Sequence, residues 1–586
     1  MKIPRRTTVY HVTKEFGIAT MGGMGTALTA IAQAQLQSGR VKPSVVMPYY
    51  SFLKRQEQYP IKTAVELVTT YKNDKGQTLP VEFKVYQMIY DFNPISNFES
   101  LPKSAKAELM SKSLRANKTM RVYLIGPGKV YPLLKSFHAN SVTQLYSTLQ
   151  VLPQEWQDQY FNKAVASFLI SRATAKHEQS LFAPLYVAPP RVDIVHLHGA
   201  TNAYVAKYMQ EFANEKFTIT PPAVIYTMHD YLDELQYTNR LDSFDKFWTS
   251  SQRNMKEVLQ GYTHNSQRVF LSPLAIDAAD AVTFVSKKMA KDMVEGKTDF
   301  YLKEVVMNSI LRKAEKGQFY GISHGVALSA NTNPYRNTQL VQNGLNFTTK
   351  LARPETKRLA KEFLIAHNQL RLEDLERPLV LYVGRFQYNK GLETFSEAIE
   401  LFRKYNVKFA ILGQPNNYPL EWVEKLAEEN LDHVVLMSTV HQQERWLSYF
   451  RAAADFVYVP SVTESFGLVA VEGLAFGSAV ISTGVGGLSE FLVDRKESME
   501  FNAYLFDAQR QGSLAQAVKM ASDDYQQLIT SPVDHENFVV RMMQSAQELS
   551  WDKGNEEGPV YDYLRVYEKA MKEKRLKNRQ GLKEDS

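Results

Sequence analysis

The stretch PSVTESFGLVAVEGLAFGSAVISTGVGGLSEFLVD, residues 460–494, gives the clearest indication of the fold. It continues the apolar run FVYVP (456–460), and it contains a second apolar run, AVIST (479–483). Apolar residues recur at helical spacing between the two runs, so the segment predicts a strand, a helix beginning near Phe466 and a second strand. A unit of this kind is typical of a parallel sheet covered by helices on both faces.

The same alternation of short apolar runs and longer amphipathic stretches continues along the chain and places it in the α/β class. Further strand candidates are 41–49, 120–126, 192–198, 223–229, 281–286, 378–384, 407–413 and 434–437. A polar, irregular segment at 331–350 suggests a domain boundary. We therefore expect a first domain at 1–345, a second at 376–545, and a crossover helix with a basic tail at 546–586. Segments 51–118 and 231–272 are expected to be insertions on the first domain.

Composition excludes several classes of protein. The 586 residues contain no cysteine, which removes disulfide scaffolds, thiol catalysis and iron–sulfur clusters. A net charge of +7 from 69 basic and 62 acidic residues is too mild for a nucleic-acid partner. No run approaches the roughly 18 apolar residues of a membrane helix. We expect a cytoplasmic protein; membrane association through the basic last helix is the alternative to a solvated helix face.

Two acidic residues in the quoted stretch mark a candidate site. Glu464 precedes the expected helix, and Glu472 lies eight positions later, two turns inside it. The N–H groups of Phe466, Gly467 and Leu468 would be unpaired donors at the helix N-terminus, suited to a phosphate or a developing anion. The alternative is an ordinary capped helix with two surface acids.

A second motif, VGRFQYNKGL (383–392), joins a strand end to two cations. Arg385 and Lys390 suit a diphosphate, one as a planar fork and the other as a point charge. The alternative is a polar turn between a strand and a helix. No D-x-D pair or H-E-x-x-H motif suggests a metal site. The glycines at 22–25 do not complete a dinucleotide-binding fingerprint.

Together the two motifs resemble the C-terminal domain of retaining glycosyltransferases with the GT-B fold. They are similar to the bacterial-type glycogen and starch synthases, and the E-x7-E spacing is similar to that of the sucrose-synthase-like family. Segments of the first half resemble the synthases in the same order: TMGGMGTAL (20–28), VDIVHLHG (192–199), TMHDY (227–231), ADAVTFVSKKMAKDM (279–293) and GISHGV (321–326). The resemblance implies two Rossmann-like, doubly wound domains facing a central cleft, with the C-terminal helix crossing back to the first domain.

For the second half, the resemblance implies a donor site. Arg385 and Lys390 would neutralise the diphosphate leaving group. Glu464 would face the hydroxyls of the donor sugar, with the N–H groups of Phe466, Gly467 and Leu468 beside it. Glu472 would hold the ribose hydroxyls.

For the first half, the resemblance implies that His198 touches the donor sugar near the reacting carbon. Gly22 and Gly23 would let the first loop approach the phosphates. Of the neighbouring histidines, His196 in mid-strand is expected in the core. His229 at a strand end is expected either in the site or in a turn.

The expected activity is transfer of a hexosyl unit, most simply glucosyl, from UDP-glucose or ADP-glucose to a glucan, with no metal and no other cofactor. A small sugar, a lipid or a cell-wall acceptor is the first alternative. A non-catalytic glucan-binding protein is the second, because Thr20 replaces the synthase lysine and Gly199-Ala200 replace an Asp-Trp pair.

Overall fold

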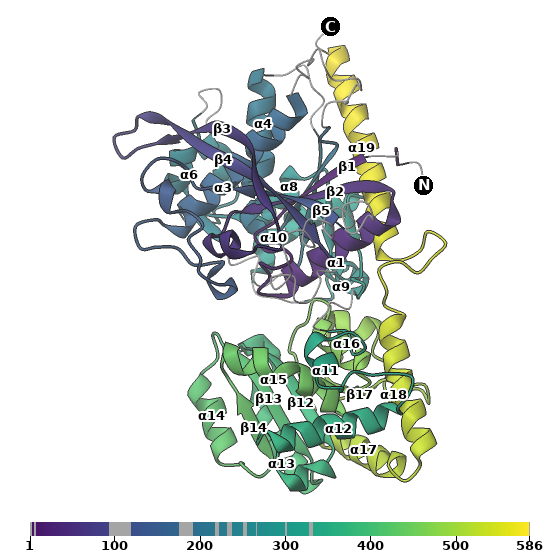
Figure 1. The fold of residues 1–586 in the computed structure, drawn as a ribbon. Helices are drawn as coiled ribbons and strands as arrows, with labels where there is room; N and C mark the ends of the chain where they lie inside the picture. The colour runs from purple at the N-terminus through teal and green to yellow at the C-terminus, as the bar shows by residue number, and fades with distance from the viewer. Residues whose placement is uncertain are drawn as a thin grey trace, which may run out of the picture. The chain divides into compact units, whose positions relative to one another are not determined.

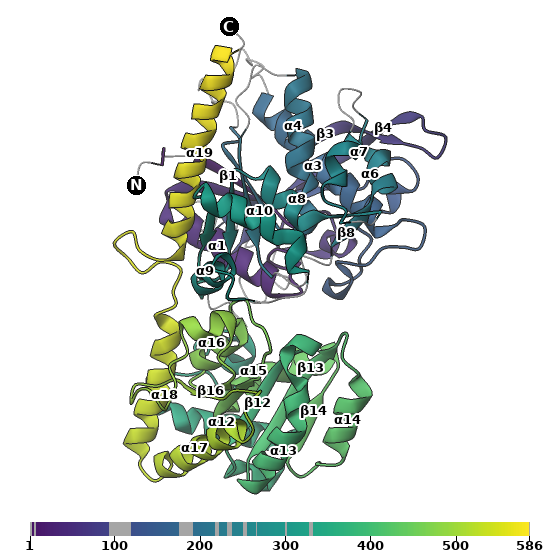
Figure 2. The same cartoon turned by 180° about the vertical axis from the view of Figure 1, so that it is seen from behind.

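The computed structural model divides into two compact units (Figures 1 and 2). The first contains residues 1–323 and 554–586, and the second contains residues 324–553. The residues whose structure is described are 3–4, 7–92, 119–174, 191–216, 222–230, 237–249, 255–264, 267–298, 302–326 and 332–584. Parts of the two expected insertions therefore lie outside the described residues.

The division falls about twenty residues before the boundary that the sequence suggested at 345. The segment after 331 belongs to the second unit because it packs there: the Asn337 side chain donates to Ser448 at 3.0 Å. The chain leaves the second unit again after Lys553. The segment that enters the second unit and the segment that leaves it form a parallel bridge between Val326 and Ser550, and Val326 N–H donates to the Leu549 carbonyl at 2.6 Å.

The first unit is built on a nine-stranded sheet in the order β11-β10-β7-β6-β1-β2-β5-β4-β3. Its strands are β1 (Thr7–Val12), β2 (Val41–Pro48), β3 (Ile61–Lys72), β4 (Thr78–Asp91), β5 (Thr119–Ile125), β6 (Ile194–His198), β7 (Ala223–Met228), β10 (Ala281–Phe284) and β11 (Phe319–Gly321). A separate two-stranded sheet joins β8 (Thr238–Arg240) and β9 (Arg268–Phe270). The helices are α1 (Gly23–Ser38), α3 (Gln154–Thr174), α4 (Tyr204–Lys216), α6 (Leu241–Phe247), α7 (Met255–Gln260), α8 (Leu271–Ala278), α9 (Lys287–Val294), α10 (Lys303–Glu315) and α19 (Pro559–Glu584).

Alternation along β1 explains how the two faces of this sheet are covered. Tyr10 points to one face, where its hydroxyl accepts from Arg172 of α3 at 2.9 Å. His11 points to the other face and bonds to Gln35 of α1 at 2.9 Å. Helix α19 packs on that second face beside α1, because its Tyr567 receives the Gln35 amide at 2.9 Å. The expected return of the C-terminal helix to the first domain is therefore seen in the packing of α19.

The described part of the expected insertion at 51–118 is not a separate appendage. Strands β3 and β4 form an antiparallel hairpin, and β4 pairs antiparallel with β5, so the hairpin extends the main sheet. Sequence reasoning missed these strands because their alternating, half-exposed pattern differs from the continuous apolar runs of the parallel strands.

The second unit has a six-stranded, fully parallel sheet in the order β14-β13-β12-β15-β16-β17. Its strands are β12 (Leu379–Phe386), β13 (Lys408–Pro415), β14 (Val434–Met437), β15 (Phe456–Val459), β16 (Ala479–Ser482) and β17 (Ala503–Leu505). Its helices are α11 (Thr338–Gln342), α12 (Arg353–Ala366), α13 (Phe395–Lys404), α14 (Leu420–Glu428), α15 (Val440–Ala453), α16 (Leu468–Ala475), α17 (Ser513–Leu528) and α18 (Pro532–Gln547). Every strand expected from the apolar runs of this half is present.

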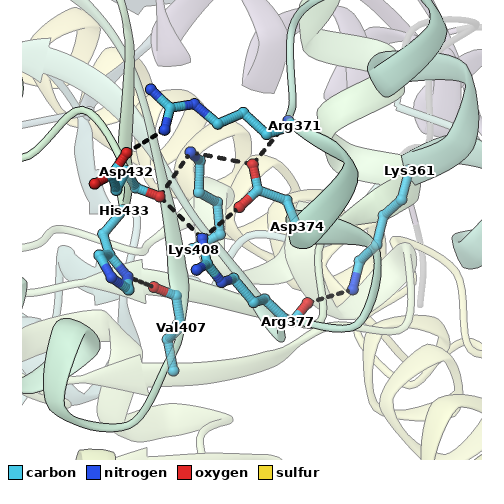
Figure 3. A network of polar contacts seen from close by, with 8 residues as sticks. All are labelled: Lys361, Arg371, Asp374, Arg377, Val407, Lys408, Asp432 and His433. Carbon is cyan, nitrogen blue, oxygen red and sulfur yellow. Dashed lines mark hydrogen bonds and ion pairs between the residues drawn. The ribbon is translucent and has the colours of Figure 1, made fainter.

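A network of charges fastens α12 and the short turn after it to the sheet (Figure 3). Asp374 is fully buried and receives Arg377 at 2.9 Å and Lys408 at 3.1 Å. Lys361 reaches the Arg377 carbonyl at 2.8 Å. Burial, opposed by the charge of Asp374, lowers the pKa of Lys408. The network joins α12 and the turn after it to the start of β13.

Among the helices that the structure describes, none combines the length and the apolar character needed to cross a membrane.

Candidate active site

Two loops at the carboxyl ends of β12 and β15 lie against each other in the second unit. Gly391 has φ +70°, and a Cβ there would lie 1.9 Å from the Pro460 carbonyl oxygen. Val462 N–H donates to the Asn389 carbonyl at 2.9 Å. The close approach requires glycine at 391 for both reasons. In an open parallel sheet, ligands bind at this edge.

The two loops bring Lys390 and Glu464 together. The Lys390 ammonium lies 2.7 Å from Glu464 Oε2, and the Ser461 hydroxyl donates to the same oxygen at 3.1 Å. Both charged side chains are only partly exposed, at 24% and 17%. The sequence predicted Lys390 for the diphosphate and Glu464 for the sugar hydroxyls, and the structure pairs the two side chains directly.

Arg385 lies at the end of β12, where it is exposed. Tyr382 beneath it is buried and donates its hydroxyl to the Arg385 carbonyl at 3.3 Å. Burial, with a smaller contribution from the charge of Glu464, raises the pKa of the Tyr382 hydroxyl. Tyr382 therefore stays neutral and supports the strand end that carries the cation.

The N-terminus of α16 lies in the same pair of loops. Helix α16 begins at Leu468, two residues later than the sequence suggested, with Gly467 as its cap at φ +100°. Ala470 N–H makes the first bond back to the Gly467 carbonyl at 3.1 Å. The N–H groups of Phe466, Gly467 and Leu468 precede that bond, so they belong to the donors that a helix N-terminus leaves to other partners.

Glu472 is engaged elsewhere. Its carboxylate forms an ion pair with Arg451 of α15, and both side chains are largely buried. The expected role of Glu472 in holding ribose hydroxyls stays a prediction, and in this structure one of its oxygens is already paired.

In the first unit, the loop after β1 is folded around Glu15. The Glu15 carboxylate accepts the N–H groups of Met21 and Gly22, both at 2.8 Å, and receives the Tyr146 hydroxyl. The N–H of Gly22 is therefore occupied by Glu15, and the expected approach of this loop to the phosphates stays a prediction. Gly23 begins α1 immediately afterwards.

His198 is fully buried, with both ring nitrogens bonded to other histidines. Its Nε2 lies 2.9 Å from Nδ1 of His11, and its Nδ1 lies 2.9 Å from Nε2 of His229. His196 bonds to Tyr567 at 2.7 Å and to Thr227 at 2.6 Å. His229 at the end of β7 is half-buried.

Burial favours the neutral form of His11, His196 and His229. Burial lowers the pKa of His11 to about 4 and that of His229 to about 3. It also lowers the pKa of His196 well below its usual value. The rings of His11, His196 and His229 are therefore neutral at neutral pH, and each has one nitrogen that donates and one that accepts.

The ring nitrogens of His11, His196 and His198 lie within 4.8 Å of one another, close enough to be considered as a metal site. Hydrogen bonds within the protein account for both nitrogens of each ring. The close approach of these ring nitrogens is therefore explained by hydrogen bonds, without a metal ion.

Sequence reasoning missed several residues of these surroundings. Glu15, His11 and Gln35 lie in or beside the first strand and helix, but their roles depend on neighbours far away in the chain. Tyr567 is separated from Gln35 by 532 positions. No local pattern signals Arg451 as the partner of Glu472, which it meets across two helices.

Fold and site together define a glycosyltransferase with the GT-B fold. Residues 366–530 match the family model described as glycosyl transferases group 1. Residues 8–308, just over half of the chain, match the model described as the starch synthase catalytic domain. The chain belongs to this starch synthase family, as the motifs suggested.

Individual relatives agree with the family match. A glycogen synthase of Hydrogenobaculum sp. is 25% identical over 64% of this chain and 72% of its own length. Glycogen synthase 1 of Synechococcus sp. is 29% identical over 35% of this chain, a match that spans only 42% of that protein. The catalytic domain of Arabidopsis thaliana starch synthase IV, bound to ADP and acarbose, aligns with a TM-score of 0.70 at 18% identity and covers 97% of this chain and 100% of that chain.

Proposed function

We propose that the protein transfers a glucosyl unit from a nucleotide-diphosphate glucose to an α-glucan, with retention of configuration at the anomeric carbon. The observation that carries the proposal is the pairing of Lys390 with Glu464 beside Arg385 and the N-terminus of α16. The family membership supplies the class of donor and acceptor. A cytoplasmic location and the absence of a metal requirement are part of the proposal.

The chemical problem is the charge of the leaving group. As the bond from the anomeric carbon to the diphosphate oxygen breaks, the diphosphate gains negative charge and the sugar becomes cation-like. Arg385, Lys390 and the N–H groups before α16 would stabilise that charge. By analogy with oxyanion donors, each contact would contribute about 2–4 kcal/mol to the transition state.

The acceptor hydroxyl would attack on the face that the diphosphate leaves. The new bond joins its oxygen to the anomeric carbon, and its proton passes to the departing phosphate oxygen. Glu464 would release Lys390 to the diphosphate and turn its carboxylate to the sugar hydroxyls. Loss of the ion pair is tolerable because both side chains are partly exposed.

A transfer assay identifies the nucleotide base of the donor. Purified protein is offered ADP-glucose and UDP-glucose in parallel with glycogen, and incorporation of labelled glucose is measured. The ADP bound to the related starch synthase IV domain favours ADP-glucose. No incorporation from either donor, with slow release of free glucose, would contradict a glucan acceptor; no reaction of either donor would contradict the proposed activity.

Arg385→Ala tests the site. We expect kcat to fall by about 10²–10³-fold, the loss of one transition-state contact, with an unchanged melting temperature. Arg403→Ala, at an equally exposed arginine near the end of α13, is the matched control and should keep full activity. Normal turnover in a folded Arg385→Ala variant would remove the arginine from the site.

A further inference from the structure

Three aromatic side chains of the second unit form a series at the carboxyl ends of β12 and β13. Tyr388 begins the short turn η7 (Tyr388–Lys390), Tyr418 follows β13, and Trp422 lies in the first turn of α14. The ring centroids of Tyr388 and Tyr418 are 5.1 Å apart, and those of Tyr418 and Trp422 are 5.5 Å apart. The series therefore begins on the same turn that carries Lys390.

The three rings differ in how far they reach into water. Tyr388 is 56% exposed, whereas Tyr418 and Trp422 are partly buried and pack against the core of the unit. A single exposed apolar side chain is common on a protein surface and needs no explanation. Here the exposed ring is backed by two aromatic neighbours that the core anchors, so an apolar surface is held in a fixed position beside the donor loops.

The loops that carry the series are joined by polar bonds that do not involve the Tyr388 ring. Tyr388 N–H donates to Asn417 Oδ1 at 3.3 Å, and the Gln387 side-chain amide donates to Asn416 at 3.1 Å. Tyr418 N–H donates to the carbonyl of the last residue of β12 at 3.0 Å. Replacement of the Tyr388 ring therefore leaves all three bonds possible.

The polar groups around the rings are neutral or acidic. Asn416, Asn417 and Glu393 are exposed. Burial raises the pKa of the Tyr418 hydroxyl, and the charge of Glu393 adds to the rise, so this carboxylate acts on the ring. Amides and carboxylates bond to hydroxyl groups, and ligand sites combine aromatic surface with a few such polar groups. A neutral ligand with many hydroxyls fits these surroundings better than an anion.

We propose that Tyr388, supported by Tyr418 and Trp422, binds a glucopyranose ring of an α-glucan chain at the surface of the second unit. The tyrosine ring packs against a C–H face of the sugar, and Asn416, Asn417 and Glu393 are available to its hydroxyls. The class of ligand rests on the proposed function.

A chain bound here and at the transfer site is held at two points. The second contact then forms at a high effective concentration, which increases the total affinity. A polymer gains from this effect, and an oligosaccharide too short to reach both points does not. The series therefore favours glycogen over short acceptors.

The test is electrophoresis of the full chain through native gels that contain glycogen and no sugar nucleotide. Tyr388→Ala should raise the Kd for glycogen by about 5- to 10-fold. Tyr388→Leu should do the same, because leucine keeps apolar volume without a flat ring, and Tyr388→Phe should bind as the wild type does. Unchanged retardation of the alanine and leucine variants, with normal melting temperatures, would overturn the proposal.

Leu372→Ala is the matched control for exposed apolar surface. Leu372 is 71% exposed on η6 (Leu372–Leu375) of the same unit, before the start of β12. The variant should bind glycogen as the wild type does. A loss equal to that of Tyr388→Ala would mean that glycogen adheres to any exposed apolar group, and it would refute a site at Tyr388.

A nucleotide base also stacks on aromatic rings, so the donor is the competing ligand. Calorimetric titration with ADP and with UDP separates the two. Tyr388→Ala should keep the nucleotide affinity of the wild type. A loss of nucleotide affinity with unchanged retardation by glycogen would assign the ring to the donor base and overturn the proposal.

Retardation needs no turnover, so this inference and the proposed function fail separately. Binding of glycogen that depends on Tyr388, in a protein that transfers no glucose, would leave the inference standing and remove the proposed function. Transfer to glycogen with binding that does not depend on Tyr388 would do the reverse. In the active protein, Tyr388→Ala should raise the KM for glycogen more than that for maltotriose, and an equal rise would contradict attachment at two points.

Discussion

At the scale of single residues, the proposed reaction depends on charged side chains at the carboxyl ends of β12 and β15 in the second unit. Lys390 and Glu464 form an ion pair at 2.7 Å. A surface ion pair contributes about 0–1 kcal/mol to stability, and this pair, at 24% and 17% exposure, should lie at the upper end of that range. The pair therefore keeps two opposite charges ready at the same point, at small cost when they separate.

Lys390→Met tests this reading. We expect a loss of turnover of about 10²-fold or more, because the methionine cannot neutralise the diphosphate. The free energy of unfolding should change by less than about 1 kcal/mol. Both are measured on the same preparation, by glucose transfer and by urea denaturation. A destabilised variant that keeps its turnover would mean that the pair is structural.

Elements of the fold are held by polar groups that are buried as completely as the apolar core. The network of Figure 3 joins α12, the turn at η6 (Leu372–Leu375) and β13 through Asp374. Hydrogen bonds among His11, His198 and His229 connect β1, β6 and the end of β7, and Gln35 connects them to α1. Tyr567 of α19 bonds to Gln35 as well. In each network one buried side chain, Asp374 or Gln35, bonds to residues of more than one element.

Asp374→Asn should destabilise the second unit by about 3–5 kcal/mol, because Lys408 and Arg377 lose their buried counter-charge. Asp432 offers a matched control in the same network: it pairs with Arg371 but is 76% exposed, so Asp432→Asn should cost less than about 1 kcal/mol. Thermal denaturation of the two variants measures the difference. An equal loss of stability in the two variants would show that the burial of Asp374 does not increase its contribution.

The buried histidines predict a loss of stability in acid. His11 has a folded-state pKa of about 4, below the unfolded value of about 6.5, so the unfolded chain takes up a proton first as pH falls. Its contribution is fully present above pH 6.5 and is lost as pH falls toward 4, by about 3 kcal/mol in total.

Urea denaturation at pH 7.5, 5.5 and 4.5 measures this loss, with His11→Asn as the comparison. The variant should be less stable at pH 7.5 but should lose less on acidification than the wild type. Carboxyl groups titrate equally in both proteins, so the difference isolates the histidine. Parallel pH profiles would contradict a buried, neutral His11.

At the scale of the whole molecule, the first unit is assembled from two distant parts of the chain. Residues 1–323 supply its nine-stranded sheet, and residues 554–586 supply α19, whose Tyr563 and Tyr567 are fully buried there. The second unit is continuous in sequence. The stability of the first unit should therefore depend on residues 554–586, and that of the second unit should not.

A chain ending at Lys553 should retain the unfolding transition of the second unit and lose or lower that of the first. Removing α19 exposes the sheet face that Tyr567 covers and leaves His196 without its partner. Calorimetry of the truncated and full chains, with limited proteolysis to assign the transitions, measures the effect. An unchanged first-unit transition would show that α19 is dispensable for its stability.

The sequence by itself determined the class of fold, the family and ten of the strands, those with clear apolar runs; it did not predict β1, β11 or β17. Such strands are local patterns, and motifs such as E-x7-E and Gly-Arg…Lys-Gly keep their spacing in any conformation. It also placed Arg385, Lys390 and Glu464 as candidates, because all three follow strand ends.

Only the tertiary structure decided which of these residues meet, and which partners occupy them. Three contacts join positions that are separate in sequence: the ion pair of Lys390 with Glu464, the hydrogen bond of Gly22 to Glu15, and the hydrogen bond between His198 and His229. So does the antiparallel hairpin β3–β4, whose half-exposed alternation carries a weaker signal. The physical reason is that hydrogen bonds and ion pairs act over a few ångströms in space, and distance along the chain does not fix that separation.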